Sequence, residues 1–202
     1  MANPRIISGK AKGMRLAAVP GDTTRPITDR VKEALFNILG QDIVGSVFLD
    51  LFAGTGSVGI EALSRGASFV LLNDRHRQAV NTIHANLKHT RLGDSAQVSQ
   101  LDAFGLLSKT PAQLYDYVFI APPQYKNMWV QAIQTLDNHP EILSESAWAI
   151  VQIDPVEYAP LTLNNLAEFD QRKYGSTLLI FYKRTIHPPD TEKSSTNLSS
   201  SS

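Results

Sequence analysis

The chain has 202 residues, 43% of them hydrophobic, and its 19 basic residues balance its 19 acidic ones. This length fits one ordinary domain with its own core. The lack of cysteine excludes a disulfide scaffold and a thiolate metal site, and the five histidines are scattered, so we expect no metal. No apolar run reaches the ~18 residues of a membrane span, and no hydrophobic signal segment begins the chain. We therefore expect a cytoplasmic protein with no membrane partner.

The balanced net charge conceals an uneven distribution. Residues 1–32 hold seven basic and two acidic residues, a local excess of +5, which leaves −5 for the remainder. Glycine and proline recur through the first 27 residues, so this segment is expected to be a short hairpin or an extended arm. A basic arm on an acidic body favours a polyanionic partner, although a solvated strand and turn would give the same composition.

A helix is predicted directly after the arm. Thr28 can cap its first turn, Asp29 suits the positive end of the helix dipole, and Gly40 is a plausible stop. One apolar stripe gives the helix a buried side, formed by Val31, Leu35, Ile38 and Leu39.

From residue 46 onward, strand patterns alternate with helical ones. Strands are predicted over residues 47–52, 69–72, 96–101, 117–120 and 147–153, and helices over 57–65, 78–88 and 129–136. This alternation is typical of an α/β fold with a mainly parallel sheet covered on both faces. Residues 169–174 and 177–182 are expected to pair as an antiparallel hairpin around Gly175. The polar segment 185–202 is expected to be a disordered tail, which leaves an arm over 1–27 and a domain over 28–184.

A glycine-rich loop follows the first strand of this pattern. Gly54, Gly56 and Gly59 match the dinucleotide fingerprint, with Asp74 about twenty residues further on, but this match alone is weak. The Asp50 carboxylate before the loop would repel a pyrophosphate and attract a cation. S-adenosylmethionine carries both an ammonium and a sulfonium, so the loop favours this methyl donor over NAD. A tight turn that binds no ligand is the alternative.

Two further segments follow strands at the same edge of the predicted sheet. Asp102 could accept a hydrogen bond from an adenine amine, or it could cap the helix that begins at Ala103. The next strand ends in Ala-Pro-Pro-Gln-Tyr over residues 121–125, where two prolines fix a rigid turn. Tyr125 could stack on a base, although a plain turn with a surface tyrosine is also possible.

Three blocks of the chain resemble the RsmD family of ribosomal RNA methyltransferases, which methylate the 2-amino group of a guanine in small-subunit RNA. They are TRPITDRVKEALFNIL over 24–39, DLFAGTGSVGIEALSRGA over 50–67 and YGSTLLIFY over 174–182, within a match covering about residues 5–184. The resemblance implies a seven-stranded, Rossmann-like class I methyltransferase fold with an N-terminal extension. It also implies S-adenosylmethionine as cofactor, ribosomal RNA or the assembling small subunit as partner, and a monomer.

The resemblance assigns roles to individual residues. The donor site would comprise Asp50, Phe52, Gly54, Gly56, Asn73, Asp74, Asp102 and Ala103. RNA contacts would come from Arg5, Lys10, Lys12, Arg15, Arg25 and Arg30, although Arg25 and Arg30 could instead pair with Asp29 or Glu33. The catalytic segment would be Pro122, Pro123, Gln124 and Tyr125.

The chain departs from the family pattern at two places. The family's catalytic motif is Asp- or Asn-Pro-Pro-Tyr, but Ala121 and Gln124 occupy its first and fourth positions here. Leu72 stands where the family usually has an acid for the ribose hydroxyls, so Asn73 or Asp74 would have to substitute. These departures leave a second hypothesis open, an RNA-binding homologue with impaired catalysis.

Overall fold

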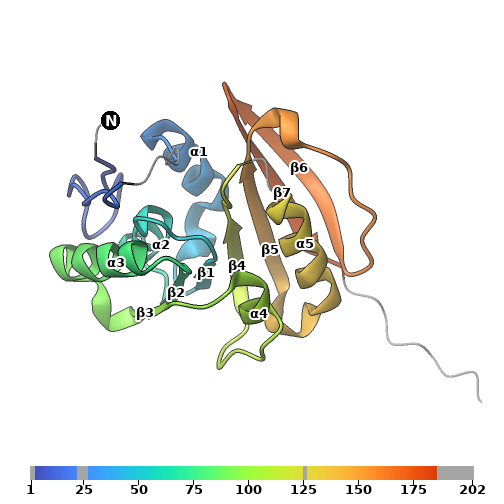
Figure 1. The fold of residues 1–202 in the computed structure, drawn as a ribbon, viewed down its shortest axis with the longest axis horizontal. Coiled ribbons are helices and arrows are strands. Elements are labelled where there is room, and N and C mark those ends of the chain that lie inside the picture. The colour runs from blue at the N-terminus through green and yellow to red at the C-terminus, as the bar shows by residue number, and fades with distance from the viewer. Residues whose placement is uncertain (1–2, 22–26, 125–126, 186–202) are drawn as a thin grey trace, which may run out of the picture.

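A single seven-stranded sheet organises the computed structural model, which describes residues 3–21, 27–124 and 127–185. The strands lie in the order β3-β2-β1-β4-β5-β7-β6 (Figure 1). Neighbours among the first five pair in parallel, and β7 runs antiparallel to both β5 and β6. The predicted mainly parallel sheet with a C-terminal hairpin is confirmed. The strands are β1 (Val47–Asp50), β2 (Phe69–Asn73), β3 (Ala96–Ser99), β4 (Tyr115–Ile120), β5 (Leu143–Ile153), β6 (Leu166–Tyr174) and β7 (Thr177–Arg184).

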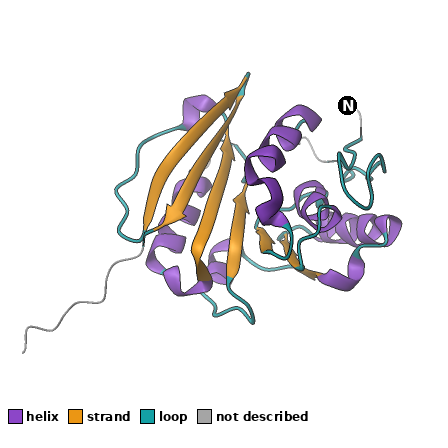
Figure 2. Cartoon of the chain, turned by 180° about the vertical axis from the view of Figure 1, so that it is seen from behind, coloured by secondary structure: helices purple, strands orange, loops and turns teal. Residues whose placement is uncertain are grey.

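Helices cover both faces of this sheet (Figure 2). One core joins α1, α2 and α3 to the sheet through residues such as Leu35, Ile60 and Ile83, and the other joins α4 and α5 through Leu107 and Trp129. None of the helices in the described ranges is long and apolar enough to cross a membrane. The helices are α1 (Asp29–Leu39), α2 (Ser57–Ser64), α3 (Arg77–Thr90), α4 (Ala103–Leu107) and α5 (Met128–Asn138).

The ends of α1 follow the predicted capping pattern. The Thr28 hydroxyl accepts a hydrogen bond from the Val31 N–H at 3.3 Å. At the other end, Gly40 has a φ of +59° and donates its N–H to the Phe36 carbonyl. Since L side chains rarely adopt that φ, a glycine is favoured where α1 stops.

The N-terminal arm is a hairpin-like loop, with an antiparallel bridge between Arg5 and Arg15. Its apolar residues Ile6, Ala11 and Leu16 are buried in the same core as α1 and α2. The arm therefore packs against the domain through one side and presents its charged residues on the other.

A buried ion pair fastens the arm to the domain. The Glu61 carboxylate of α2 accepts hydrogen bonds from the Ile7 and Ser8 N–H groups at 2.7 and 3.0 Å. The Lys32 ammonium lies 3.7 Å from Glu61 and donates to the Arg5 carbonyl at 2.6 Å. Burial lowers the pKa of Lys32, and Glu61 opposes that effect. We call Lys32 and Glu61, with the arm backbone they hold, the arm latch.

Some predicted boundaries shift in the structure. The first strand ends at Asp50 rather than at residue 52, and the third ends at Ser99 rather than at 101, because the chain turns there toward the next helix. The fifth begins at Leu143, four residues before the predicted start, because a 3₁₀ turn at 140–142 leads directly into it. Residues 186–202, within the predicted tail, lie outside the described residues.

Candidate functional site

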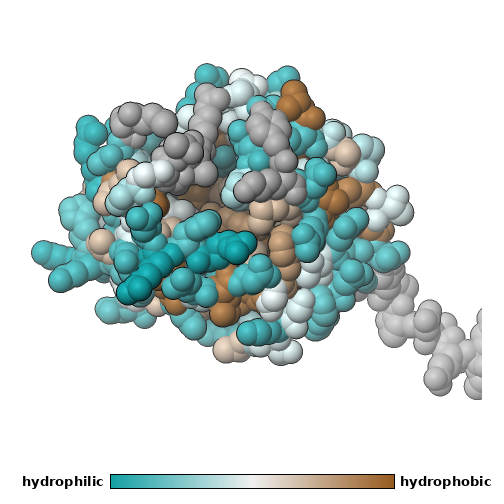
Figure 3. All heavy atoms as spheres, viewed as in Figure 1, coloured by the Kyte–Doolittle hydropathy of each residue, from teal (hydrophilic) through white to brown (hydrophobic). Residues whose placement is uncertain are grey.

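A cavity of about 590 Å³ opens at the carboxyl ends of the parallel strands. It lies where the strand order reverses between β1 and β4, the place where open α/β sheets bind ligands. Its volume is within the range of small-molecule sites. The arm lines it through Val19 and Pro20, and the β6–β7 turn lines it through Ser176 and Thr177. On the face seen in Figure 3, hydrophobic residues show in the middle among hydrophilic ones.

Asp50 is the buried acid of this cavity. It ends β1, the residue is 2% exposed, and its Oδ2 accepts the Gly59 N–H at 2.9 Å. Burial raises the pKa of Asp50 to about 7, Gly59 opposes the shift, and Asp74 adds to it. A positive charge placed in the cavity would stabilise the carboxylate, whereas an anion would push the pKa further up.

The glycine loop connects Asp50 to α2. Gly54 and Gly56 have φ values of +53° and +77°, which glycine adopts without strain. Gly59 is required for a different reason, because a Cβ there would lie 2.8 Å from Cδ2 of Leu72. Leu72, the departure from the family pattern, therefore packs beneath the loop, and the lack of a side chain at Gly59 lets α2 approach it closely.

Asn73, the last residue of β2, and Asp74, which follows it, have different surroundings. Asn73 is 1% exposed, and its amide binds the Leu51 and Leu101 backbone and the Ser99 hydroxyl. Asp74 is partly exposed, and its two carboxylate oxygens accept the Gly54 and His76 N–H groups at 2.9 and 2.8 Å. Both residues line the cavity, but only the Asp74 carboxylate has capacity left for hydroxyl groups.

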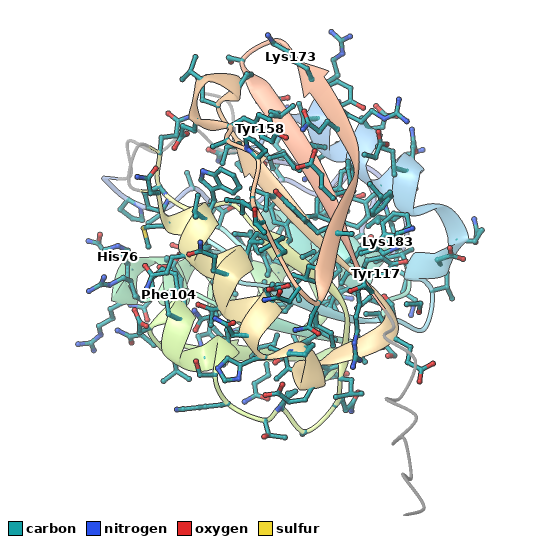
Figure 4. The ribbon with its side chains drawn as sticks, turned by 90° about the vertical axis from the view of Figure 1, so that its right-hand side faces the viewer. His76, Phe104, Tyr117, Tyr158, Lys173 and Lys183 are labelled. Atoms are coloured by element: carbon teal, nitrogen blue, oxygen red, sulfur yellow. The ribbon has the colours of Figure 1, made fainter. Side chains whose placement is uncertain are left out.

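Asp102 follows β3 and is the N-cap of α4. Its Oδ2 accepts the Gly105 N–H at 3.0 Å, so the capping role is confirmed. Asp102 is also exposed and lines the cavity with Phe52 and Ala103, so the binding role is compatible with this cap and stays a prediction. Figure 4 places His76, before α3, and Phe104, on α4, on the same side of the molecule.

The proline turn after β4 forms the opposite end of the cavity. Ala121, Pro122, Pro123 and Gln124 all line it, with Gln124 the most exposed. The Ala121 methyl packs partly against the core and brings no polar group. Tyr125 lies outside the described residues.

The basic residues of the arm differ in their surroundings. Lys10, Lys12, Arg15 and Arg30 are exposed. The Arg5 guanidinium is exposed too, but it pairs with the Asp29 carboxylate of α1 at 2.6 Å. Asp29 is therefore paired from the arm, not from Arg30 of its own helix, and Arg25 lies outside the described residues.

Sequence reasoning missed two residues that bear on the site. Asn86 of α3 exchanges hydrogen bonds with the Ala17 backbone and donates to the Thr55 carbonyl, so it joins the arm to the glycine loop. Gln152, near the end of β5, lines the cavity although the half of the strand around it, residues 147–153, is otherwise apolar. A single amide in the apolar predicted strand 147–153 was the available signal for Gln152.

Comparison with known proteins connects this geometry to one family. The model of the family described as conserved hypothetical protein 95 matches residues 4–183. The "Putative rRNA methyltransferase YlbH" of Bacillus subtilis is 38% identical over 182 residues, which cover 89% of this chain and 98% of that protein. The "Ribosomal RNA small subunit methyltransferase D" of Escherichia coli K12 is 35% identical and covers 89% of each chain.

Solved structures have the same architecture. The "Putative methyltransferase yhhF" of Escherichia coli superposes with a TM-score of 0.80 at 31% identity, covering 91% of this chain and 98% of that one. An RNA methyltransferase of Salinibacter ruber, solved with S-adenosyl-L-homocysteine, has a TM-score of 0.60 at 17% identity and covers 82% and 97%. The second likeness bears on the fold alone, which is that of class I methyltransferases.

Proposed function

Because the chain belongs to the conserved hypothetical protein 95 family, which it matches over residues 4–183, we propose that it transfers the methyl group of S-adenosylmethionine to the 2-amino group of a guanine in small-subunit ribosomal RNA. The names of the relatives support methyl transfer as the reaction and ribosomal RNA as the substrate. The guanine itself follows from the family resemblance of the sequence blocks around the cavity.

One observation carries the donor assignment. Asp50, Asp74 and Asp102 lie at or just beyond the carboxyl ends of the neighbouring strands β1, β2 and β3, and all three line one cavity. In this order they suit the sulfonium and ammonium region, the ribose hydroxyls and the adenine amine of a donor lying across the strand ends. Three carboxylates along one wall would disfavour the pyrophosphate of NAD.

The proline turn follows β4, the strand next to β1, which supports an acceptor base at the β4 side of the donor. The lone pair of the guanine 2-amino nitrogen forms a bond to the methyl carbon as the carbon–sulfur bond breaks. That bond's electron pair stays on sulfur, and the extra proton on nitrogen passes to water. Because this lone pair is delocalised into the ring, acceptors that hold the N–H groups in line would contribute strongly. The Pro122 carbonyl is one candidate acceptor, and the Ala121 side chain supplies none.

The assay is methyl transfer from labelled S-adenosylmethionine to small-subunit RNA, naked and in assembled subunits, taken from cells without this activity. We expect one labelled guanine, identified by nuclease digestion. Calorimetry with the donor tests the second candidate, a homologue that binds RNA without methylating it, which the alanine at position 121 favours. Donor binding without transfer to any form of the RNA would support that candidate and refute ours.

A further inference from the structure

Ala121 stands at the start of the proline turn, where the family motif has an Asp or Asn side chain that can accept a hydrogen bond. Another residue would have to supply this acceptor. If the proposed function holds, the guanine amine presents two N–H groups, and the Pro122 carbonyl is the candidate acceptor for one of them. We propose that Gln152 of β5 supplies the second acceptor, so that its side-chain oxygen contacts the base to be methylated. This inference rests on the proposed function and assigns a base-contacting residue that lies outside the sequence motif.

Strand register places Gln152 beside Ala121. The last paired residues of β4 and β5 are Ile120 and Val151, so Ala121 and Gln152 are the next step along each strand. Neighbouring strands lie about 4.8 Å apart. The two positions are therefore adjacent, within reach of one side chain.

The two side chains also point to the same face of the sheet. Phe119 and Ile150 are register partners, and both are buried in the core shared with α1 and α2. Side chains on one face recur every second residue, so Ala121 and Gln152 continue that face. Ala121 packs against the same core, as this alternation requires.

The surroundings of Gln152 leave its oxygen without a role inside the protein. Its Oε1 is buried and has no hydrogen-bond partner among the described residues. A buried polar atom without a partner is costly, and most such atoms in native proteins are satisfied. Gln152 also lines the cavity, and its register partner on β7 is the fully buried Leu179. Rotation of the side chain toward the cavity would therefore let a bound ligand satisfy this oxygen.

The position of β5 in the sheet matches the acceptor end of the site. The candidate donor carboxylates follow β3, β2 and β1, and the sheet continues through β4 to β5. Gln152 therefore lies on the far side of the proline turn from the donor, where an amine facing the methyl group would have its N–H groups. Gln124 is the competing candidate within the motif, but it is exposed, so water can satisfy its amide.

The transfer assay tests this assignment with matched variants. We expect Gln152→Leu to lower kcat roughly a hundredfold, the scale for loss of one positioned hydrogen-bonding group, with donor affinity within twofold of the wild type. Gln152→Glu keeps an acceptor oxygen and should retain more activity. Gln134→Leu, on the exposed side of α5, is the control for the same change of side chain. The double variant Ala121→Asn/Gln152→Leu should have a kcat at least tenfold higher than that of Gln152→Leu alone.

Three results would overturn the inference while leaving the proposed function in place. They are a Gln152→Leu kcat within threefold of the wild type, no rescue by Ala121→Asn, or loss of rate in Gln124→Leu but not in Gln152→Leu. In each case the wild type would still transfer the methyl group, so the proposed function would stand while the role of Gln152 would not.

A binding measurement keeps the inference testable if the wild type transfers no methyl group. The probe is a nine-nucleotide single-stranded RNA with one central guanosine, or with inosine, which lacks the 2-amino group. With S-adenosylhomocysteine bound, the wild type should prefer the guanosine probe roughly three- to tenfold, the scale of one net hydrogen bond, and Gln152→Leu should lose that preference. Equal affinity of the wild type for both probes, including no affinity for either, would refute the inference.

Discussion

The raised pKa of Asp50 predicts that donor affinity depends on pH. With a pKa of about 7, roughly one tenth of the Asp50 carboxyls are ionised at pH 6 and roughly nine tenths at pH 8. Only the carboxylate attracts the cationic donor, so the apparent Kd should fall about tenfold between these pH values. The Asp50→Asn variant should show no such change. At pH 8 it should bind about 1.5–3 kcal/mol more weakly, since that is the range for hydrogen bonds to charged groups.

Calorimetry in buffers of different ionisation enthalpy provides the measurement. The wild type should release about half a proton per donor bound at pH 7, and Asp50→Asn should release almost none. Because His76 also lines the cavity, His76→Gln is the control that isolates Asp50. A wild-type Kd that stays constant from pH 6 to 8 would refute the electrostatic basis of the donor site.

The raised pKa of Asp50 also predicts that the stability of the donor-free protein depends on pH. Stability should be greater at low pH, whereas donor affinity should be greater at high pH. The folded state raises this pKa from 3.8 to about 7, so it binds the proton more tightly than the unfolded chain. Stability from Asp50 is therefore complete below pH 3.8 and is lost as the pH rises through about 7. A shift of this size corresponds to at most about 4 kcal/mol. Without donor, Asp50→Asn should be more stable than the wild type at pH 8, and equal melting temperatures there would contradict the shift.

Three further changes test other parts of the structure. Gly59→Ala should cost about 1–3 kcal/mol in thermal melts, because its Cβ would meet Leu72, and Leu72→Val should recover part of the loss. No recovery would mean that the strain lies elsewhere. Glu61→Gln should cost about 3–5 kcal/mol in urea unfolding, because Lys32 would remain buried without its counter-charge; a cost below about 1 kcal/mol would speak against the arm latch. Lys12→Gln should flatten the salt dependence of RNA binding by about 0.7 in log–log slope, and an unaltered slope would place Lys12 away from phosphates.

The spacing of apolar residues and the turn residues predicted those parts of the fold that form between neighbours in the sequence. The alternation of strands and helices, the caps of α1 and the hairpin around Gly175 all follow from residue period and turn chemistry, and the structure has them. The glycine loop was found for the same reason, since its residues are contiguous in the chain.

The features that the sequence did not predict depend on contacts between residues that are far apart in the chain. Lys32 and Glu61 are ordinary helix-surface charges by sequence, and only the seating of the arm buries them. Sequence also left Asn73 and Asp74 equivalent, although the hydrogen bonds that each side chain already makes decide which has free acceptors. Gln152 gains its interest from the strand register with Ala121, and spacing along the chain carries no information about that register.

The arm latch has a consequence for anyone dissecting this protein. A fragment starting at residue 28 would keep every strand and the whole glycine loop, yet Glu61 would lose the two arm N–H groups that it accepts, and Lys32 would lose the Arg5 carbonyl. Removing the arm would thus destabilise α2, the helix that begins at the glycine loop. Loss of methylation in such a truncated protein would not identify the segment as an RNA-binding tail, and point changes of exposed side chains are the cleaner way to assign that role.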